Sequence, residues 1–105
     1  MIRIILACQF GASTDLLAVK MQEAAKNMDM DVTVNAYSYT SLEQVMDEAD
    51  IVLLGPQIRF KKKALEKQFA DKNVEFMVVE PSDYGMLNGE KVLRTAVETV
   101  ENRRR

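Results

Sequence analysis

Short runs of apolar, mostly β-branched residues alternate along this chain with longer segments in which apolar residues recur every three or four positions. Runs of the first kind are typical of β-strands, and segments of the second kind are typical of amphipathic helices. The pattern predicts four strands, at Ile2 to Ala7, Asp31 to Tyr37, Asp50 to Leu54 and Val74 to Val79. It predicts four helices, at Ser13 to Asp29, Ser41 to Glu48, Gln57 to Phe69 and Asn88 to Asn102.

Three of the strand runs, IRIILA, IVLL and FMVV, are almost continuously apolar, which is typical of strands buried on both faces of a parallel sheet. The run DVTVNAY alternates between apolar and polar residues, so we expect it at the edge of the sheet. Strands that alternate with helices imply right-handed crossovers. We therefore expect an α/β fold: a four-stranded parallel sheet, doubly wound, with helices on both faces and the flavodoxin-like strand order 2-1-3-4.

The helical period also predicts which side chains face the core. These residues are Leu17, Met21, Ala24, Ala25 and Met28 in the first helix, Leu42, Val45 and Met46 in the second, Ile58, Leu65 and Phe69 in the third, and Val92, Leu93, Ala96, Val97 and Val100 in the last.

Composition limits the class of protein. The 105 residues, 48% apolar and 29% charged, fit one globular domain over residues 1–105, and the net charge of −2 gives no reason to expect a nucleic-acid partner. No apolar run approaches the roughly 18 residues that span a bilayer, and a signal peptide's basic region is missing, so we expect a cytoplasmic protein without membrane insertion. A single cysteine fits a reducing compartment.

The chain has no histidine, which excludes Ser-His and Cys-His catalytic pairs and imidazole metal ligands from this chain. We expect no metal site. The terminal run NRRR is interpreted first as a solvated tail; a helix end favoured by the helix dipole and a contact patch are the alternatives.

The predicted topology locates a binding site. Loops that follow parallel strands gather at one edge of the sheet, and ligands bind there beside the first strand, where the strand order reverses. Cys8, the only cysteine, stands at that place, at the start of the stretch CQFGASTD.

This stretch has the features of an anion-binding loop. Gly11 permits close approach of the backbone to a ligand, and the first turn of the following helix offers unpaired N–H groups and a favourable dipole to a tetrahedral anion. Such surroundings bias a thiol toward the reactive thiolate. Cys8 is thus either a small buried hydrophobe or a nucleophile, and the loop favours the nucleophile. The predicted phosphate-binding residues are Gln9, Phe10, Gly11, Ala12, Ser13 and Thr14.

Two enzyme classes place a cysteine in such a loop. Small doubly wound tyrosine phosphatases require CxxxxxR, because the arginine grips the phosphate with two hydrogen bonds. Here Thr14 occupies the arginine position, which argues against hydrolysis.

The sequence resembles the second class, the IIB component of the phosphoenolpyruvate-dependent sugar phosphotransferase system (PTS), of the lactose/cellobiose (diacetylchitobiose) type. The motifs that carry the resemblance are IILACQFGASTDLL, LLGPQIRF and DYGMLNGEKVL, and it extends over essentially the whole chain. It implies a phosphotransferase without a cofactor. Cys8 would accept a phosphoryl group from a phosphohistidine on the IIA component and pass it to a cellobiose-, lactose- or chitobiose-type sugar held by the membrane component IIC.

Two stretches depart from the family pattern. Asp15 replaces a small hydroxyl residue, and we expect its carboxylate to point away from the site, because its charge would oppose a phosphate. Arg59 to Lys63 is unusually basic, so it is either a solvated helix face or a docking surface for an acidic rim on IIA or IIC. Gln57 and Tyr84 follow later strands within shared motifs and are secondary candidates for contact with the phosphoryl group or a partner.

Three alternatives stay open at this point. A low-molecular-weight-phosphatase-like enzyme would use the same loop for hydrolysis. A regulator of the same fold would receive the phosphoryl group as a signal. A flavin-binding module would need aromatic platforms, but the chain has no tryptophan, and Tyr84 is the one candidate.

Overall fold

All four strands run parallel in one sheet, in the order β2-β1-β3-β4, as the sequence predicts. The computed structural model describes residues 1–9 and 12–104. The strands are β1 (Ile2–Cys8), β2 (Val32–Ser38), β3 (Ile51–Leu54) and β4 (Glu75–Val78). β1 lies in the middle, where Ile4 pairs with Val34 of β2 on one side and with Ile51 of β3 on the other. The alternating strand β2 lies at an edge, which confirms that prediction as well.

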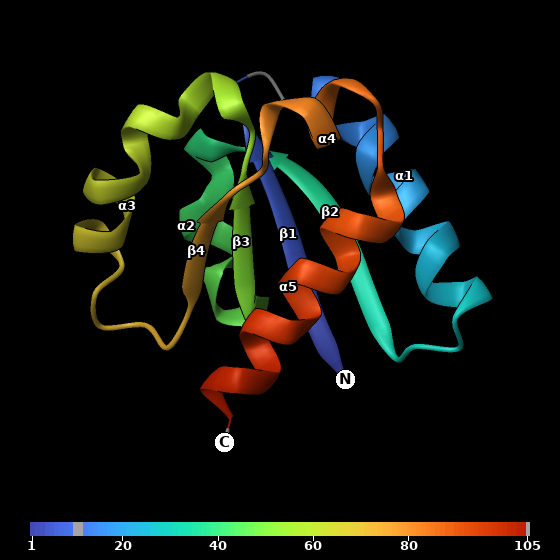
Figure 1. Ribbon diagram of the computed structural model, residues 1–105. Helices are drawn as coiled ribbons and strands as arrows, with labels where there is room; N and C mark the ends of the chain where they lie inside the picture. Colours follow the sequence, from blue (N-terminus) through green and yellow to red (C-terminus); the bar gives the residue numbers. More distant parts are fainter. Residues whose placement is uncertain (10–11, 105) are drawn as a thin grey trace.

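Helices cover both faces of the sheet (Figure 1). They are α1 (Ala12–Asn27), α2 (Leu42–Val45), α3 (Lys62–Gln68), α4 (Pro81–Gly85) and α5 (Gly89–Arg103). Successive residues of β1 supply two separate cores, because side chains of a strand alternate between its faces. Ile4 and Leu6 pack into the core that includes residues of α1 and α5, whereas Ile5 and Ala7 pack into the core that includes residues of α2 and α3.

The predicted inward faces of the helices are largely confirmed. Every core residue predicted for the third and last helices is buried. In the first two helices Ala24, Met28 and Val45 are partly buried and the other predicted residues are fully buried.

Three segments differ from the predicted helices. The predicted helix Gln57 to Phe69 begins as a 3-10 helix, Pro56–Lys61, and continues as α3, because Ile58 has non-helical backbone angles (φ −116°, ψ 23°). The predicted helix Ser41 to Glu48 is a four-residue α2 flanked by 3-10 turns. Between the predicted strand Val74 to Val79 and the predicted helix Asn88 to Asn102, the structure has an additional helix, α4, which starts at Pro81, a residue suited to the first turn of a helix.

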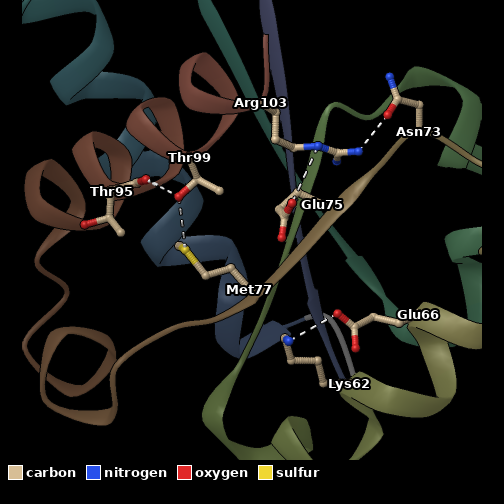
Figure 2. A network of polar contacts seen from close by, with 8 residues as sticks. All are labelled: Lys62, Glu66, Asn73, Glu75, Met77, Thr95, Thr99 and Arg103. Atoms are coloured by element: carbon tan, nitrogen blue, oxygen red, sulfur yellow. Dashed lines mark hydrogen bonds and ion pairs between the residues drawn. The ribbon is translucent and has the colours of Figure 1, made fainter. Parts of the chain in front are cut away.

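The interpretation of the C-terminal arginines as a solvated tail is wrong for Arg103 and Arg104. Arg103 Nε lies 3.5 Å from the carboxylate of Glu75 in β4, and its Nη2 donates to Asn73 Oδ1 at 2.6 Å (Figure 2). Arg104 pairs with Asp50 at 3.3 Å. Side chains at the end of α5 therefore contact residues at the amino ends of β3 and β4. Arg105 lies outside the described residues.

A tight crossing holds α1 against α5. Gly89, the first residue of α5, lies so close to α1 that an added Cβ would stand 2.7 Å from the carbonyl carbon of Lys20 and 2.8 Å from the backbone nitrogen of Met21.

In the part of the chain that the structure describes, no helix is long and apolar enough to cross a membrane.

Candidate active site at the carboxyl edge of the sheet

The carboxyl ends of the strands meet at one edge, the upper edge in Figure 1. β1 ends there at Cys8, between the end of β2, where Ser38 is its pairing partner, and the end of β3, where Leu54 pairs with Ala7. Strand order reverses beside β1, since β2 and β3 lie on opposite sides of it. The cysteine thus stands at the switch point where open α/β sheets bind ligands, as the sequence predicts.

The side chains of Cys8 and Thr14 meet at this point. The turn from β1 into α1 brings Thr14, the third residue of the helix, back to the end of the strand, and its hydroxyl donates to Cys8 Sγ at 3.4 Å. Cys8 is 2% exposed and Thr14 is fully buried. The sulfur consequently lies against the first turn of a helix of 16 residues, where backbone N–H groups and the helix dipole favour negative charge.

Ser38, at the end of β2, supports the loop from the other side. Its hydroxyl donates to the backbone carbonyl of Gln9 at 3.1 Å and lies 2.9 Å from the hydroxyl of Thr40. Sequence reasoning did not single out these two hydroxyl residues. Their position at the end of a predicted strand could have indicated a place at the active edge of the sheet.

Gln57 and Tyr84, the two secondary candidates, come together beside Gly55. The N–H of Gly55 donates to the carbonyl of Ala7 at 2.9 Å, next to Cys8 in the chain. A Cβ on Gly55 would lie 2.9 Å from Gln57 Oε1 and 3.7 Å from Tyr84 Cε2. Gly55 has an ordinary backbone conformation (φ −59°), and a Cβ there would displace only the end of the exposed Gln57 side chain.

The hydroxyl of Tyr84 is a buried donor without a hydrogen-bond partner in the described ranges. Its backbone is fixed by α4, whose Asp83 is buried and pairs with Lys91 Nζ of α5 at 3.4 Å. A buried hydroxyl that makes no hydrogen bond is costly, and such groups are found at sites that bind ligands. Tyr84 therefore offers a fixed donor at the same edge as Cys8.

The remaining predicted residues are placed as follows. Phe10 and Gly11 lie outside the described residues, and Ala12 and Ser13 form the start of the α1 backbone. Gln9 is exposed and accepts a hydrogen bond through its carbonyl group. Asp15, in the first turn of α1, has an exposed side chain. Within residues 1–9 and 12–104, no group of three or more His, Cys, Asp or Glu side chains could hold a metal ion.

This arrangement provides a sulfur nucleophile, a hydroxyl that contacts it, helix N–H groups for an anion, and a further hydroxyl donor nearby. Arg59, in the 3-10 helix that follows β3, donates to the carbonyl of Pro56 at 3.1 Å. The chemistry that fits these groups is transfer of a phosphoryl group to and from Cys8.

Comparison with known proteins points to one family. Residues 3–95 match the family described as "PTS system, Lactose/Cellobiose specific IIB subunit". The chain is 35% identical over 100 residues to the PTS system oligo-beta-mannoside-specific EIIB component of Bacillus subtilis (strain 168), which covers 95% of this chain and 97% of the relative.

Solved structures agree with this match. The cellobiose-specific phosphotransferase IIB component from Borrelia burgdorferi is 39% identical, with a TM-score of 0.79 over 96% of this chain and 93% of that one. The lactose-specific IIB component domain from Streptococcus pneumoniae has a TM-score of 0.84 over 92% of this chain and 95% of that one. At 19% identity this second likeness concerns the fold alone.

Proposed function

The chain belongs to the lactose/cellobiose-specific IIB family of the sugar phosphotransferase system, and we propose that Cys8 is its phosphoryl carrier. The observation that supports this most directly is the hydrogen bond from Thr14 to a buried sulfur at the end of the central strand. A contact of this kind orients the sulfur toward the helix N-terminus, where the phosphoryl oxygens would be held.

The reaction consists of two displacements at phosphorus. In the first, the Cys8 thiolate attacks the phosphohistidine of IIA; a sulfur–phosphorus bond forms, the nitrogen–phosphorus bond breaks, and the released imidazole takes up a proton. In the second, a sugar hydroxyl held by IIC attacks the same phosphorus; an oxygen–phosphorus bond forms, the sulfur–phosphorus bond breaks to regenerate the thiolate, and the hydroxyl proton goes to water. Because little covalent chemistry is left to the protein, positioning and charge stabilisation carry both steps.

The residues of this chain have distinct roles in those steps. Thr14 orients the sulfur, and the backbone from Gln9 through Thr14 holds the phosphoryl oxygens together with the hydroxyl of Ser13. Ser38 fixes the loop through the carbonyl of Gln9. Tyr84, with its buried hydroxyl, and the neighbouring Gln57 complete the rim on the side of β3.

The absence of a loop arginine suits a carrier better than a hydrolase. A carrier must keep its thiophosphate intact until the sugar arrives, so a loop that binds the group without strongly stabilising attack by water is an advantage. The chain supplies no histidine, and the proposed donor histidine belongs to IIA. The protein works as one domain at the cytoplasmic side of the membrane, in association with IIC.

The sugar is of the β-linked or galactoside type named for the relatives. They are described as specific for oligo-β-mannosides, cellobiose and lactose, and these differing names accompany one fold. Specificity therefore resides in the transporter that holds the sugar, and this chain delivers the phosphoryl group.

A direct test is intact-mass analysis after incubation with phosphoenolpyruvate, the general phosphotransfer proteins and a cellobiose-type IIA. The wild-type protein should gain one adduct of about 80 Da, as expected for one phosphoryl group. Cys8→Ala should gain none. An adduct that persists in Cys8→Ala, or no adduct on the wild type, contradicts the assignment of Cys8.

The lifetime of the adduct separates a carrier from a phosphatase. Without IIC and sugar, the phosphorylated protein should keep its phosphoryl group far longer than the transfer takes. Loss to water within seconds indicates hydrolase chemistry. Vesicles that contain IIC and cellobiose should discharge the adduct and form sugar phosphate, which a purely regulatory protein would not do.

A further inference from the structure

Phe60 is an aromatic side chain placed on the surface at the active edge. It is 74% exposed and lies in the 3-10 helix that follows β3, two residues after the buried Ile58. Two further apolar side chains are exposed on elements of the same edge: Leu16 in α1 (52%) and Met86 directly after α4 (79%). Exposed aromatic residues close to a reactive site often mark a surface that a partner covers.

The conformation of this segment is fixed by its neighbours. Pro56 opens the 3-10 helix, and Ile58 anchors it in the core next to α2 and α3. Lys61 Nζ lies 4.8 Å from the centroid of the Tyr39 ring and 5.6 Å from that of Phe60. The ammonium group thus lies near both rings, so Phe60 and a positive charge are presented together.

The charged residues next to Phe60 in the sequence, Arg59 and Lys61 to Lys63, are all positive. Arg59, Lys61 and Lys63 have no carboxylate within ion-pair distance among the described residues, whereas Lys62 pairs with Glu66 at 3.1 Å (Figure 2). The chain as a whole carries a net charge of −2. A local basic patch on an acidic protein favours a partner with carboxylates at the matching position.

This patch is continuous with the active edge. Its 3-10 helix starts directly after Gly55, whose N–H binds the carbonyl of Ala7 beside Cys8. A protein that covers Phe60 and its flanking cations would therefore reach the edge where Cys8 lies. The upper edge of Figure 1 shows the segment after β3 and the helix α4 side by side with the end of β1.

We infer that Phe60, Arg59, Lys61 and Lys63 form the docking surface for the phosphohistidine donor, which should offer an apolar socket rimmed by carboxylates. The inference rests on the proposed function, because it names the partner surface of the same site. A shaped protein socket fits the observations better than a membrane does, since Phe60 is one aromatic side chain on a segment that Pro56 and Ile58 hold in place. An anionic bilayer would attract the exposed lysines Lys20 and Lys26 of α1 as well.

The test compares the patch with a matched surface on α1. Phe60→Ala is paired with Val19→Ala, because Val19 is also exposed (51%) and apolar. The charge reversal Lys61→Glu/Lys63→Glu is paired with Lys20→Glu/Lys26→Glu, which changes the net charge equally. The readout is the initial rate of Cys8 phosphorylation by phosphorylated cellobiose-type IIA at low donor concentration, measured at two salt concentrations, with circular dichroism to check folding.

Phe60→Ala should lower this rate about fivefold to tenfold, as expected for a residue at the centre of an interface. Lys61→Glu/Lys63→Glu should lower it about tenfold at low salt and flatten its salt dependence. Both α1 controls should stay within about twofold of wild type. After long incubation all folded variants should reach the same mass adduct, because Cys8 and its loop are untouched.

Several results would overturn the inference. The first is that the Phe60 and lysine variants of the patch react as fast as wild type. The second is that Lys61→Glu/Lys63→Glu and its control Lys20→Glu/Lys26→Glu are slowed equally, because such slowing reflects net charge alone. A third is a normal donor rate combined with lost transfer to the sugar, which assigns the patch to IIC. A fourth is a normal donor rate combined with lost binding to phosphatidylserine vesicles, which assigns it to the bilayer. If the wild type itself gains no adduct, the proposed function fails, whatever the variants do.

Discussion

The hydroxyl of Thr14 and the sulfur of Cys8 lie 3.4 Å apart, both buried, where the central strand passes into α1. They stand six positions apart in the sequence and come into contact where the central strand is followed by the helix. Because a nucleophile must be held in a defined orientation, this contact supports the proposed role of Thr14 in positioning the sulfur.

Replacing Thr14 tests that role. Thr14→Val keeps the shape of the side chain but removes the donor, so the rate of Cys8 phosphorylation should fall about tenfold. Thr14→Ser keeps the hydroxyl and should retain most of the rate. Thermal unfolding of both variants serves as the control for stability. A valine variant that reacts as fast as wild type shows that the hydrogen bond has no part in the transfer.

Tyr84 should show opposite effects on stability and on rate. Tyr84→Phe removes a buried hydroxyl that has no partner among the described residues, so the free energy of unfolding should stay equal or rise by up to about 1 kcal/mol. If the hydroxyl donates to the phosphoryl group, the transfer rate should fall about tenfold. Denaturant unfolding and the phosphorylation assay measure the two effects. An unchanged transfer rate would show that the Tyr84 hydroxyl has no part in the reaction and that the ring only packs against Gly55.

Asp15 is exposed in the first turn of α1, and we expect it to act on the helix and not on the reaction. Asp15→Ser removes a carboxylate that stabilises the helix N-terminus, so the protein should lose about 0.3–1 kcal/mol of stability. The rate of transfer to Cys8 should be the same as in wild type. A faster rate in the serine variant would mean that the carboxylate repels the incoming phosphoryl group.

Gly89 and Gly85 give a matched pair for the contact between helices. Gly89→Ala places a Cβ 2.7 Å from the backbone of α1, and neither helix can move without disturbing the core, so we expect a loss of about 1–3 kcal/mol. Gly85→Ala meets nothing within 4 Å and should change stability by less than about 1 kcal/mol. Chemical denaturation of both variants measures the difference. Equal effects would show that the crossing has more room than the backbone distances indicate.

Gln22 of α1 covers the open edge of the sheet. Its amide group donates to the carbonyl of Val32 at 3.0 Å and accepts from the N–H of Val34 at 2.9 Å, in the manner of a neighbouring strand. Gln22→Ala leaves these backbone groups without that partner, so stability should fall by about 1–2 kcal/mol. The exposed edge should also promote self-association, which analytical ultracentrifugation detects.

Gln44→Ala, which changes an exposed glutamine of α2, is the control for that substitution and should behave as wild type. A monomeric Gln22→Ala variant of full stability would show that water replaces the amide group at the strand edge without loss.

The sequence by itself determined the layers, the strand order, the edge position of β2 and the place of Cys8. These features follow from hydrophobic periodicity, which is a property of neighbouring positions, and from the handedness of strand–helix–strand units. The prediction of an anion-binding loop also rested on neighbouring residues alone, because a strand end, a glycine and hydroxyl residues stand together in CQFGASTD.

Only the tertiary structure decided which distant residues meet at that loop. Ser38 contacts Gln9 from 29 positions away, and Gln57 and Tyr84 meet beside Gly55 because separate strands end at one edge. The helix α4 is too short for its five residues to show a periodic pattern. The arginines at the end of α5 pair with carboxylates of the sheet, which no local pattern signals. The periodicity of a chain predicts its elements, whereas contacts between elements depend on how the assembled sheet and helices pack.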